Sequence, residues 1–366
     1  MRTIVSGGGT AGHIHPALSV AGLLAGEHDE VTFIGTPGGL EARLVPEAGV
    51  TFLPLPASGF DRSRPWTVLT SSVVVASSAV RAWLLMGSRR PDVVVGFGGY
   101  VSIPVGLAAV VRRVPLVLHE QNSVPGLANR LLSRWAAAVA VTYEESARHL
   151  RHPARAVVTG NPVRTEMSCA SREKSRSAMG ATDEEIVVLA FGGSRGARHL
   201  NTALVGLCTR LMAVPGVRVV HVAGQVEAPA VREALSSCAG FDASRWQVHG
   251  YLEDMAGALT AADLVLARAG ATSIAEISTV GRAAILVPYP FATDDHQTAN
   301  AATMVEHGAA VLVADSELDG DCFAEALLGL IGDSQARATM AAASRELGRP
   351  DAADRVARLV RDAVRV

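Results

Sequence analysis

The sequence predicts an α/β protein made of two doubly wound domains, each a parallel sheet covered by helices. Short apolar runs rich in β-branched residues alternate with helical stretches along nearly the whole chain. This alternation pauses at a polar stretch around residues 169–174 and then restarts. A chain of 366 residues is long enough to bury two separate cores. We therefore expect an N-terminal domain over residues 1–162 and a C-terminal domain over residues 163–349.

The expected strands divide between the two domains. In the first domain they are residues 2–5, 31–35, 93–96, 116–119, 136–141 and 157–159. In the second domain they are residues 186–191, 218–223, 246–249, 264–267, 284–287 and 310–313. Val356, Leu359 and Val360 recur at helical spacing near the end of the chain, which predicts a terminal helix. We expect this helix, residues 350–366, to pack back on the first domain.

Composition limits the classes of function. The sequence is 49% hydrophobic with a formal net charge of −2, which suits a soluble globular protein and lacks the basic excess of nucleic-acid-binding proteins. The 4 cysteines are scattered without a CxxC pair and follow no secretory signal. We expect reduced thiols, a cytosolic protein and no nucleic-acid partner.

Segment 65–91 is unusually apolar, with about fifteen uncharged residues before Arg81 against the roughly 20 that span a bilayer. Two interpretations stay open. One is a helix that faces the core and carries small residues on its outer side. The other is a helix that lies in the membrane interface. Its apolar anchors would be Trp66, Trp83, Leu84, Leu85 and Met86, and its contacts to anionic head groups would be Arg62, Arg64, Arg81, Arg89 and Arg90.

The loop after the first strand, SGGGTAGHIHPAL (residues 6–18), has glycines in the spacing of a dinucleotide fingerprint. Such glycines let the backbone approach a ligand, and the helix that follows can hold an anion at its N-terminus. A dinucleotide site also needs an acidic residue at the end of the second strand. That strand ends in Gly35-Thr36-Pro37-Gly38, so we do not expect NAD.

His13 stands in this loop, where a dinucleotide site has only small residues. Histidine titrates near neutral pH, so His13 can take a proton from a hydroxyl group while the loop amides hold part of a substrate. A hydrogen-bonded structural histidine is the alternative. His13 and His15 alone make a weak metal site, because neither a carboxylate cluster nor a cysteine ligand accompanies them.

Loops after other strands carry further polar residues at the edge where open α/β sheets bind ligands. The glycines after the strand at 186–191 suit a phosphate cradle but lack the GKS or GKT ending of ATP-binding loops. Arg268 and Glu276 suit a diphosphate joined to a ribose. The loops are GFGGYVSIP (96–104), LHEQNSVPGLANR (118–130), GNPVR (160–164), FGGSRGARHLN (191–201), ARAGATSIAEI (267–277) and PYPFATDDHQTANA (288–301).

The motifs that cover nearly the whole chain are, in order, GGGTAGH, GFGGY, HEQN, GNPVR, GGSxGAR, RAGAxxxAE and HQTANA. In this order they resemble the MurG-type N-acetylglucosaminyltransferases of peptidoglycan synthesis. The resemblance implies the GT-B fold, with two Rossmann-like domains facing a central cleft. It also implies transfer of N-acetylglucosamine (GlcNAc) from UDP-GlcNAc to the C4 hydroxyl of the muramoyl sugar of lipid I, which gives lipid II.

The resemblance also assigns roles to individual residues. In the second domain, Ser194 would contact the diphosphate of the donor and Arg268 would neutralise its charge. The backbone of Leu252 would contact uracil, Glu276 would bind the ribose and Gln297 would bind the GlcNAc. The same donor site would include Ala271, Thr272 and Ser273. The first domain would bind the acceptor through Thr10, Ala11, Gly12, Asn122 and Arg164. His13 would be the catalytic base, supported by Glu120 and Tyr100. Arg195 stands where the family more often has glutamine, which adds charge beside the diphosphate.

In this interpretation the reaction needs neither a cofactor nor a metal. Attack of the hydroxyl on the α-linked UDP sugar gives a β linkage in one displacement, and the donor loops lack a DxD-like pair, with Asp294-Asp295 as the nearest acidic residues. The resemblance implies a peripheral protein on the cytoplasmic face of the cell membrane, in contact with undecaprenyl-linked lipid I and with proteins of cell-wall synthesis and cell division.

Four rival functions stay open. The first is a related UDP-sugar glycosyltransferase with a different lipid or secondary-metabolite acceptor. The second is a nucleotide-sugar epimerase on the same fold, which would convert UDP-GlcNAc without an acceptor. The others are a non-catalytic nucleotide-binding module and, least favoured, a dehydrogenase.

Overall fold

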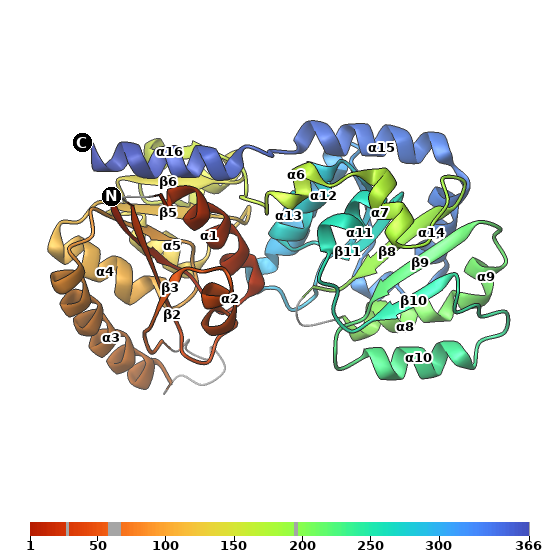
Figure 1. Cartoon of the computed structure of the whole chain (residues 1–366), viewed down its shortest axis with the longest axis horizontal. Coiled ribbons are helices and arrows are strands. Elements are labelled where there is room, and N and C mark those ends of the chain that lie inside the picture. The colour runs from red at the N-terminus through yellow and green to blue at the C-terminus, as the bar shows by residue number, and fades with distance from the viewer. Residues whose placement is uncertain (27–28, 58–66, 194–196, 366) are drawn as a thin grey trace. The chain divides into compact units, whose positions relative to one another are not determined.

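The computed structural model describes residues 1–26, 29–57, 67–193 and 197–365, with the backbone alone for residues 67–72. The chain forms two compact units, shown in Figure 1. Unit 1 consists of Met1–Arg164 together with Arg349–Val366, and unit 2 consists of Thr165–Gly348. The chain therefore leaves unit 1 after Arg164 and returns to it at Arg349.

In the described part of unit 1, seven strands form one parallel sheet in the order β3-β2-β1-β4-β5-β6-β7. The order reverses between β1 and β4, which is the kind of switch point where doubly wound sheets bind ligands. The strands expected from the sequence do not include β3. This short edge strand has no fully buried residue and ends at a proline, Pro54. The strands are β1 (Arg2–Ser6), β2 (Glu30–Gly35), β3 (Thr51–Pro54), β4 (Val93–Gly96), β5 (Leu116–Glu120), β6 (Ala138–Val141) and β7 (Ala156–Val158).

Helices cover both faces of this sheet. Because side chains alternate along a strand, Ile4 faces the core under α3 and α4, and its neighbour Val5 faces the core under α1 and α16. The helices of unit 1 are α1 (Ala11–Leu24), α2 (Glu41–Glu47), α3 (Thr67–Arg89), α4 (Ser102–Arg112), α5 (Leu127–Leu132) and α16 (Ala352–Val364), with the short 3-10 helices η1 (Glu144–His149) and η2 (Pro153–Arg155).

The terminal helix α16 lies along α1, and Figure 1 shows this blue helix next to the red helix α1. Val356 and Val360 are fully buried in the same core cluster as Val20 of α1. Arg361 adds a hydrogen bond from Nη2 to the carbonyl oxygen of Leu23, at 2.7 Å. Burial of one valine contributes about 1.5–3 kcal/mol, so the apolar face of α16 stabilises the return of the chain to unit 1.

In the described part of unit 2, six strands form a second parallel sheet in the order β10-β9-β8-β11-β12-β13. The α/β class and the two parallel sheets that the sequence predicts are thus confirmed. The strands are β8 (Ile186–Phe191), β9 (Val217–Val222), β10 (Trp246–His249), β11 (Leu264–Arg268), β12 (Ala283–Val287) and β13 (Ala310–Leu312).

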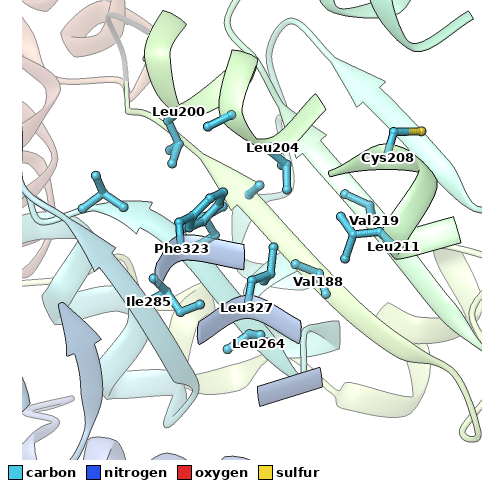
Figure 2. Packing of buried hydrophobic residues seen from close by; sticks show 14 of the residues in the cluster. Val188, Leu200, Leu204, Cys208, Leu211, Val219, Leu264, Ile285, Phe323 and Leu327 are labelled. Atoms are coloured by element: carbon cyan, nitrogen blue, oxygen red, sulfur yellow. The ribbon is translucent and has the colours of Figure 1, made fainter. Parts of the chain in front are cut away.

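The core of unit 2 lies between this sheet and the helices around it. Figure 2 shows Phe323 and Leu327 of α14 packed together with Leu200 of α8 and with Val188 and Ile285 of the sheet. The helices of unit 2 are α6 (Glu166–Cys169), α7 (Arg172–Ala178), α8 (Arg198–Gly206), α9 (Cys208–Met212), α10 (Ala228–Ser236), α11 (Met255–Ala261), α12 (Ala271–Val280), α13 (His296–Glu306), α14 (Asp321–Gly332) and α15 (Ser334–Leu347), with η3 (Thr293–Asp295) and η4 (Asp315–Glu317).

Candidate active site

Three loops of unit 1 meet at one edge of its sheet, after the neighbouring strands β1, β4 and β5. Gly98 and Gly99 have φ angles of 91° and 79°, a region that glycine adopts without strain. At Gly99 a side chain would collide with the carbonyl oxygen of Gly8, so the loops after β1 and β4 touch through their backbones. Glycine is therefore required at position 99 by this close approach.

A buried carboxylate that the sequence analysis did not single out supports the first of these loops. Glu41, at the start of α2, is fully buried and accepts hydrogen bonds from the backbone N–H of Thr36 at 2.9 Å and from its hydroxyl at 2.6 Å. It also accepts from the backbone N–H of Gly9 at 3.4 Å. A Cβ at Gly8 or Gly39 would collide with the Glu41 side chain. The glycines thus make room for an acidic residue that fastens the loop from within the protein.

His13 lies in the first turn of α1, directly after the glycine loop. Its Nδ1 atom is 3.0 Å from Oγ1 of Thr10, and its ring is so close to Gly98 that a Cβ there would stand 3.2 Å from Nε2. Thr10 is the N-cap residue of α1, and its hydroxyl is directed to this imidazole. The arrangement orients the ring and suits both a catalytic base and a structural histidine.

Glu120 ends β5 and is buried beneath the loop that follows it. Its Oε1 accepts hydrogen bonds from the backbone N–H of Asn122 at 2.9 Å and from the Asn122 side chain at 3.3 Å. Its Oε2 accepts from the backbone N–H of Gly126 at 3.0 Å and from Nδ2 of Asn129 at 2.8 Å. Burial raises the pKa of Glu120, while the four donors favour the carboxylate. These contacts organise the loop that follows β5.

The other residues expected to bind the acceptor lie near these loops. Tyr100 is 45% exposed beside α4, and Asn122 is half-buried. Ala11 and Gly12 form the first turn of α1 with His13. Burial and the charge of Arg164 lower the pKa of His15 to about 4. This places Arg164 within electrostatic reach of the same helix.

Unit 2 has its own set of loops at the carboxyl ends of its strands. Gly193 has a φ angle of 82°, and α8 begins shortly after it. Ser194, which the resemblance assigns to the diphosphate, and Arg195, which adds charge beside it, lie outside the described residues. The next helix of this kind is α12, which follows β11 and begins at Ala271 after the N-cap residue Gly270. Glycine loops followed by helix N-termini are anion-binding structures in many proteins.

Arg268, the last residue of β11, is 7% exposed and already holds a partner within the protein. Its Nη2 is 2.6 Å from Oδ1 of Asp315, and its Nη1 donates to the carbonyl oxygen of Pro288 at 3.0 Å. The resemblance assigns Arg268 to neutralising a diphosphate, whereas Asp315 stands outside the motifs and is not marked by the sequence. Because Asp315 compensates much of the arginine charge, Arg268 offers a fixed set of N–H donors more than a free positive charge.

The remaining donor-site residues occupy three loops of unit 2. Thr272 and Ser273 are half-buried in the first turn of α12, and Glu276 is 6% exposed one turn further along. Gln297, in the first turn of α13, accepts a hydrogen bond at Oε1 from the backbone N–H of Tyr289 at 2.9 Å. Leu252 follows β10 and is half-buried. The loops after β10, β11 and β12 thus carry the residues that the resemblance assigns to uracil, ribose and GlcNAc.

Among the residues that the structure describes, no group of three or more His, Cys, Asp or Glu side chains is arranged to hold a metal ion. Asp294 and Asp295 both have positive φ angles, 53° and 49°. Asp295 Oδ1 accepts a hydrogen bond from the hydroxyl of Thr298 at 2.7 Å. Asp295 therefore takes part in the turn before α13.

Helix α3 has both a buried and an exposed apolar face. Val80 and Leu84 are each 58% exposed at i, i+4 spacing. With Arg81 and Leu85 of the same helix, Leu84 lines an open groove of about 400 Å³. Over the described part of the chain, the structure contains no helix with the length and apolar character of a membrane span.

One of the expected membrane anchors in α3 lies in the core instead. Met86 is 1% exposed and belongs to the core of unit 1, because it lies on the inner face with Ala82. Trp83 is 40% exposed, and the guanidinium of Arg112 lies over its ring, 4.1 Å from the centroid. Arg89 forms an ion pair with Glu30 at 3.1 Å. Trp66, Arg62 and Arg64 lie outside the described residues.

Comparison with known proteins covers both units. The glycosyltransferase family 28 N-terminal domain matches residues 3–141, and the C-terminal domain of that family matches residues 187–356. A UDP-N-acetylglucosamine–N-acetylmuramyl-(pentapeptide) pyrophosphoryl-undecaprenol N-acetylglucosamine transferase of Desulforudis audaxviator is 42% identical over 362 residues, 97% of this chain and 96% of the relative. A protein of the same name from Halothermothrix orenii is 37% identical over 367 residues, 99% of both chains.

Solved structures agree with these relatives. The crystal structure of Acinetobacter baumannii MurG is 30% identical, matches with a TM-score of 0.76 and covers 99% of both chains. A putative UDP-N-acetylglucosamine 2-epimerase from Listeria monocytogenes matches with a TM-score of 0.69 over 97% of this chain and 94% of its own, but it is only 15% identical and shares the fold alone. The chain therefore belongs to glycosyltransferase family 28 and, within it, to the MurG family of N-acetylglucosamine transferases.

Proposed function

We propose that this protein transfers GlcNAc from UDP-GlcNAc to the C4 hydroxyl of the muramoyl sugar of lipid I, with inversion and without a metal ion, to give lipid II. The observation that carries this proposal is identity of 37–42% over nearly the full length to transferases named for this reaction. Two structures titled as UDP-N-acetylglucosamine 2-epimerases share only the fold, at 15% and 16% identity. The sequence identity therefore favours the transferase over the epimerase.

In the proposed mechanism, His13 takes the proton of the attacking hydroxyl. When Nδ1–H donates to Oγ1 of Thr10, the ring is in the tautomer whose Nε2 is the basic nitrogen. A base held in one orientation contributes about 10²–10⁴-fold to the rate of such a step. The C4 oxygen then forms a bond to C1 of GlcNAc as the bond from C1 to the diphosphate breaks, and UDP leaves.

Glu120 and Tyr100 have different roles in this proposal. The buried carboxylate of Glu120 is a positioning residue, since it organises the loop that carries Asn122 and is itself only 1% exposed. Tyr100 is exposed at the end of the loop after β4 and can contact the acceptor directly. Thr10, Ala11, Gly12, Asn122 and Arg164 complete the proposed acceptor site.

Unit 2 would bind the donor and stabilise the leaving diphosphate. The N-termini of α8 and α12 point backbone N–H groups at the carboxyl edge of the sheet, and Arg268 adds guanidinium donors there. Each donor aimed at developing charge is worth roughly 3 kcal/mol in other enzymes. Such donors can support departure of UDP without a metal. Leu252, Ala271, Thr272, Ser273, Glu276 and Gln297 would hold uracil, ribose and GlcNAc, together with Ser194.

We further propose that unit 1 works as a peripheral protein on the cytoplasmic face of the cell membrane, where a lipid-linked acceptor resides. The exposed apolar stripe of α3, formed by Val73, Val80 and Leu84, supports this proposal, as does the neighbouring Arg81. Proteins of cell-wall synthesis and cell division are partners that family resemblance favours. Nucleic acid is not among the proposed partners.

The test is a transfer assay with radiolabelled UDP-GlcNAc, a lipid I analogue and a metal chelator. We expect a β-linked disaccharide that forms only when the acceptor is present, and little product from UDP-N-acetylgalactosamine. A converted sugar nucleotide without acceptor would identify an epimerase instead. Tight UDP binding without a disaccharide would point to another acceptor, and loss of product on chelation with recovery on adding Mg²⁺ would contradict the metal-free mechanism.

A further inference from the structure

Arg268 belongs to a chain of four charged side chains within unit 2, here called the Arg268 network: Arg268, Asp315, His199 and Asp319. Arg268 Nη2 lies 2.6 Å from Oδ1 of Asp315. The other oxygen of Asp315, Oδ2, is 2.8 Å from Nδ1 of His199, and Nε2 of His199 is 3.1 Å from Oδ2 of Asp319. Acid and base groups thus alternate along one continuous set of contacts.

The network joins three segments that lie far apart in the sequence. Arg268 ends β11, Asp315 begins η4 after β13, and His199 lies in the first turn of α8. Helix α8 is the helix that follows the glycine loop after β8. The network therefore fixes the first turn of α8 relative to the carboxyl end of β11.

The guanidinium of Arg268 is almost fully buried and is held by several contacts. A buried guanidinium is destabilising unless its charge and its N–H groups are satisfied. Asp315 supplies the opposite charge, and the carbonyl oxygens of Val287 and Pro288 accept from Nη1 at 3.4 and 3.0 Å. Nη1 and Nη2 of Arg268 are thus held by contacts on two sides, while its buried Nε has no hydrogen-bond partner among the described residues.

His199 lies between two carboxylates, so both of its ring nitrogens can donate only in the protonated form. The hydrogen bonds to Asp315 and Asp319 raise the pKa of His199 accordingly. For Asp315, burial alone would raise the pKa, but the hydrogen bonds from His199 and Arg268 lower it. When His199 is protonated, the network holds two cations and two anions and has no net charge, so its effect on a ligand then comes from geometry.

We propose that Asp315 and His199 are positioning residues of the donor site: they hold the guanidinium of Arg268 and the first turn of α8 in the arrangement that binds the diphosphate of the UDP sugar. The inference rests on the proposed function, in which both Arg268 and the N-terminus of α8 contact that diphosphate. Neither Asp315 nor His199 needs to touch the ligand.

The key variant is Asp315→Asn, because charge and geometry predict opposite results for it. Removing a carboxylate next to an anion site would strengthen UDP binding if charge alone mattered. If Asp315 acts by holding Arg268, the same change weakens binding, and we expect the Kd for UDP to rise about tenfold by calorimetry. His199→Gln should weaken binding in the same direction, by a smaller factor, because Arg268 keeps Asp315 as its partner.

Glu185→Gln is the matched control. Like Asp315, Glu185 is a carboxylate paired with an arginine, since its Oε1 lies 3.1 Å from Nη2 of Arg218, but it precedes β8 and belongs to neither the network nor the first turn of α8. We expect its Kd for UDP to stay within about twofold of the wild type. The double variant Asp315→Asn with Arg268→Gln should bind UDP no more weakly than Arg268→Gln alone, since Asp315 acts through Arg268.

An unchanged or lower Kd in Asp315→Asn would overturn the proposal, as would full additivity with Arg268→Gln. If Asp315→Asn does not fold, the Kd for UDP is compared instead between His199→Gln, Arg268→Gln and the double variant of the two. UDP binding needs no acceptor, so the test separates the two proposals. Weakened UDP binding in Asp315→Asn supports the role of the network, whichever acceptor the enzyme uses. Absence of a disaccharide with the lipid I analogue would contradict only the proposed acceptor.

Discussion

The hydroxyl oxygen of Thr10 lies 3.0 Å from Nδ1 of His13, across the first turn of α1. Thr10 is the residue that begins this helix, but its side chain is directed to the imidazole and not to the helix backbone. The position of the ring is therefore set by a neighbour in the glycine motif itself. This explains why a threonine and a histidine occur three residues apart in the loop.

Thr10→Val removes this hydrogen bond while keeping the shape of the side chain. We expect kcat to fall about tenfold, which corresponds to about 1.4 kcal/mol, because the imidazole loses its fixed orientation and tautomer. Thr10→Ser should restore most of the rate, and the Kd for UDP should not change in either variant. Steady-state kinetics at saturating substrates checks this, and equal kcat values for Thr10→Val and the wild type would contradict it.

Glu120→Gln replaces an acceptor of four hydrogen bonds by a group that can accept at only one atom. Buried N–H donors left without a partner cost about 1–3 kcal/mol each, so the loop of Asn122 should shift. We expect a kcat lower by about 10–100-fold with an unchanged pH profile and unchanged UDP affinity. If Glu120 were the base, the acidic limb of the pH profile would disappear in this variant.

The stability of unit 1 should fall in mild acid because of His119. Burial lowers its pKa to about 4, from an ordinary value of 6.5. The unfolded chain therefore binds the proton first as the pH decreases from 6.5 to 4, and about 3 kcal/mol of stability is lost over this range. The penalty of a His119→Asn substitution, measured by urea unfolding, should be largest near pH 7.5 and shrink toward pH 4. A penalty independent of pH would exclude this account.

The exposed stripe of α3 should govern binding to anionic membranes. Val80→Ser with Leu84→Ser removes two side chains that are each 58% exposed, so we expect several-fold weaker co-sedimentation with phosphatidylglycerol vesicles. Arg81→Glu should weaken binding further and make it less sensitive to salt. Val226→Ser is the control, because it removes an exposed valine from unit 2. Val226 is 85% exposed. Equal vesicle binding by all variants would refute the role of α3.

Much of the fold can be predicted from the sequence because buried parallel strands appear as continuous apolar runs. The runs at 93–96 and 186–191 coincide with β4 and β8. In the short edge strand β3, proline at position 54 interrupts the apolar residues Phe52 and Leu53, so the strand escapes prediction. Within α3, the sequence indicates an apolar helix but not which face is buried. Met86 is therefore an expected anchor that the structure places in the core.

In the candidate site, the sequence marks the residues within motifs but not the partners that they contact in the fold. Residues that stand inside motifs, such as His13 and Arg268, can be singled out from the sequence, because glycine loops after strands mark the sheet edge. Their partners cannot, since Glu41 and Asp315 lie outside these motifs and contact them only through the tertiary fold. His199 directly follows the motif GGSxGAR, but the role proposed for it depends on its contacts with Asp315 and Asp319.

The central claim is that His13 takes the proton of the acceptor hydroxyl, while donor binding belongs to unit 2. The most direct measurement is the turnover rate of His13→Ala with UDP-GlcNAc and a lipid I analogue both saturating, accompanied by calorimetric UDP binding. We predict a rate lower by about 10²–10⁴-fold with an unchanged Kd for UDP. Turnover at the wild-type rate would contradict the assignment and make His13 a structural residue of the glycine loop.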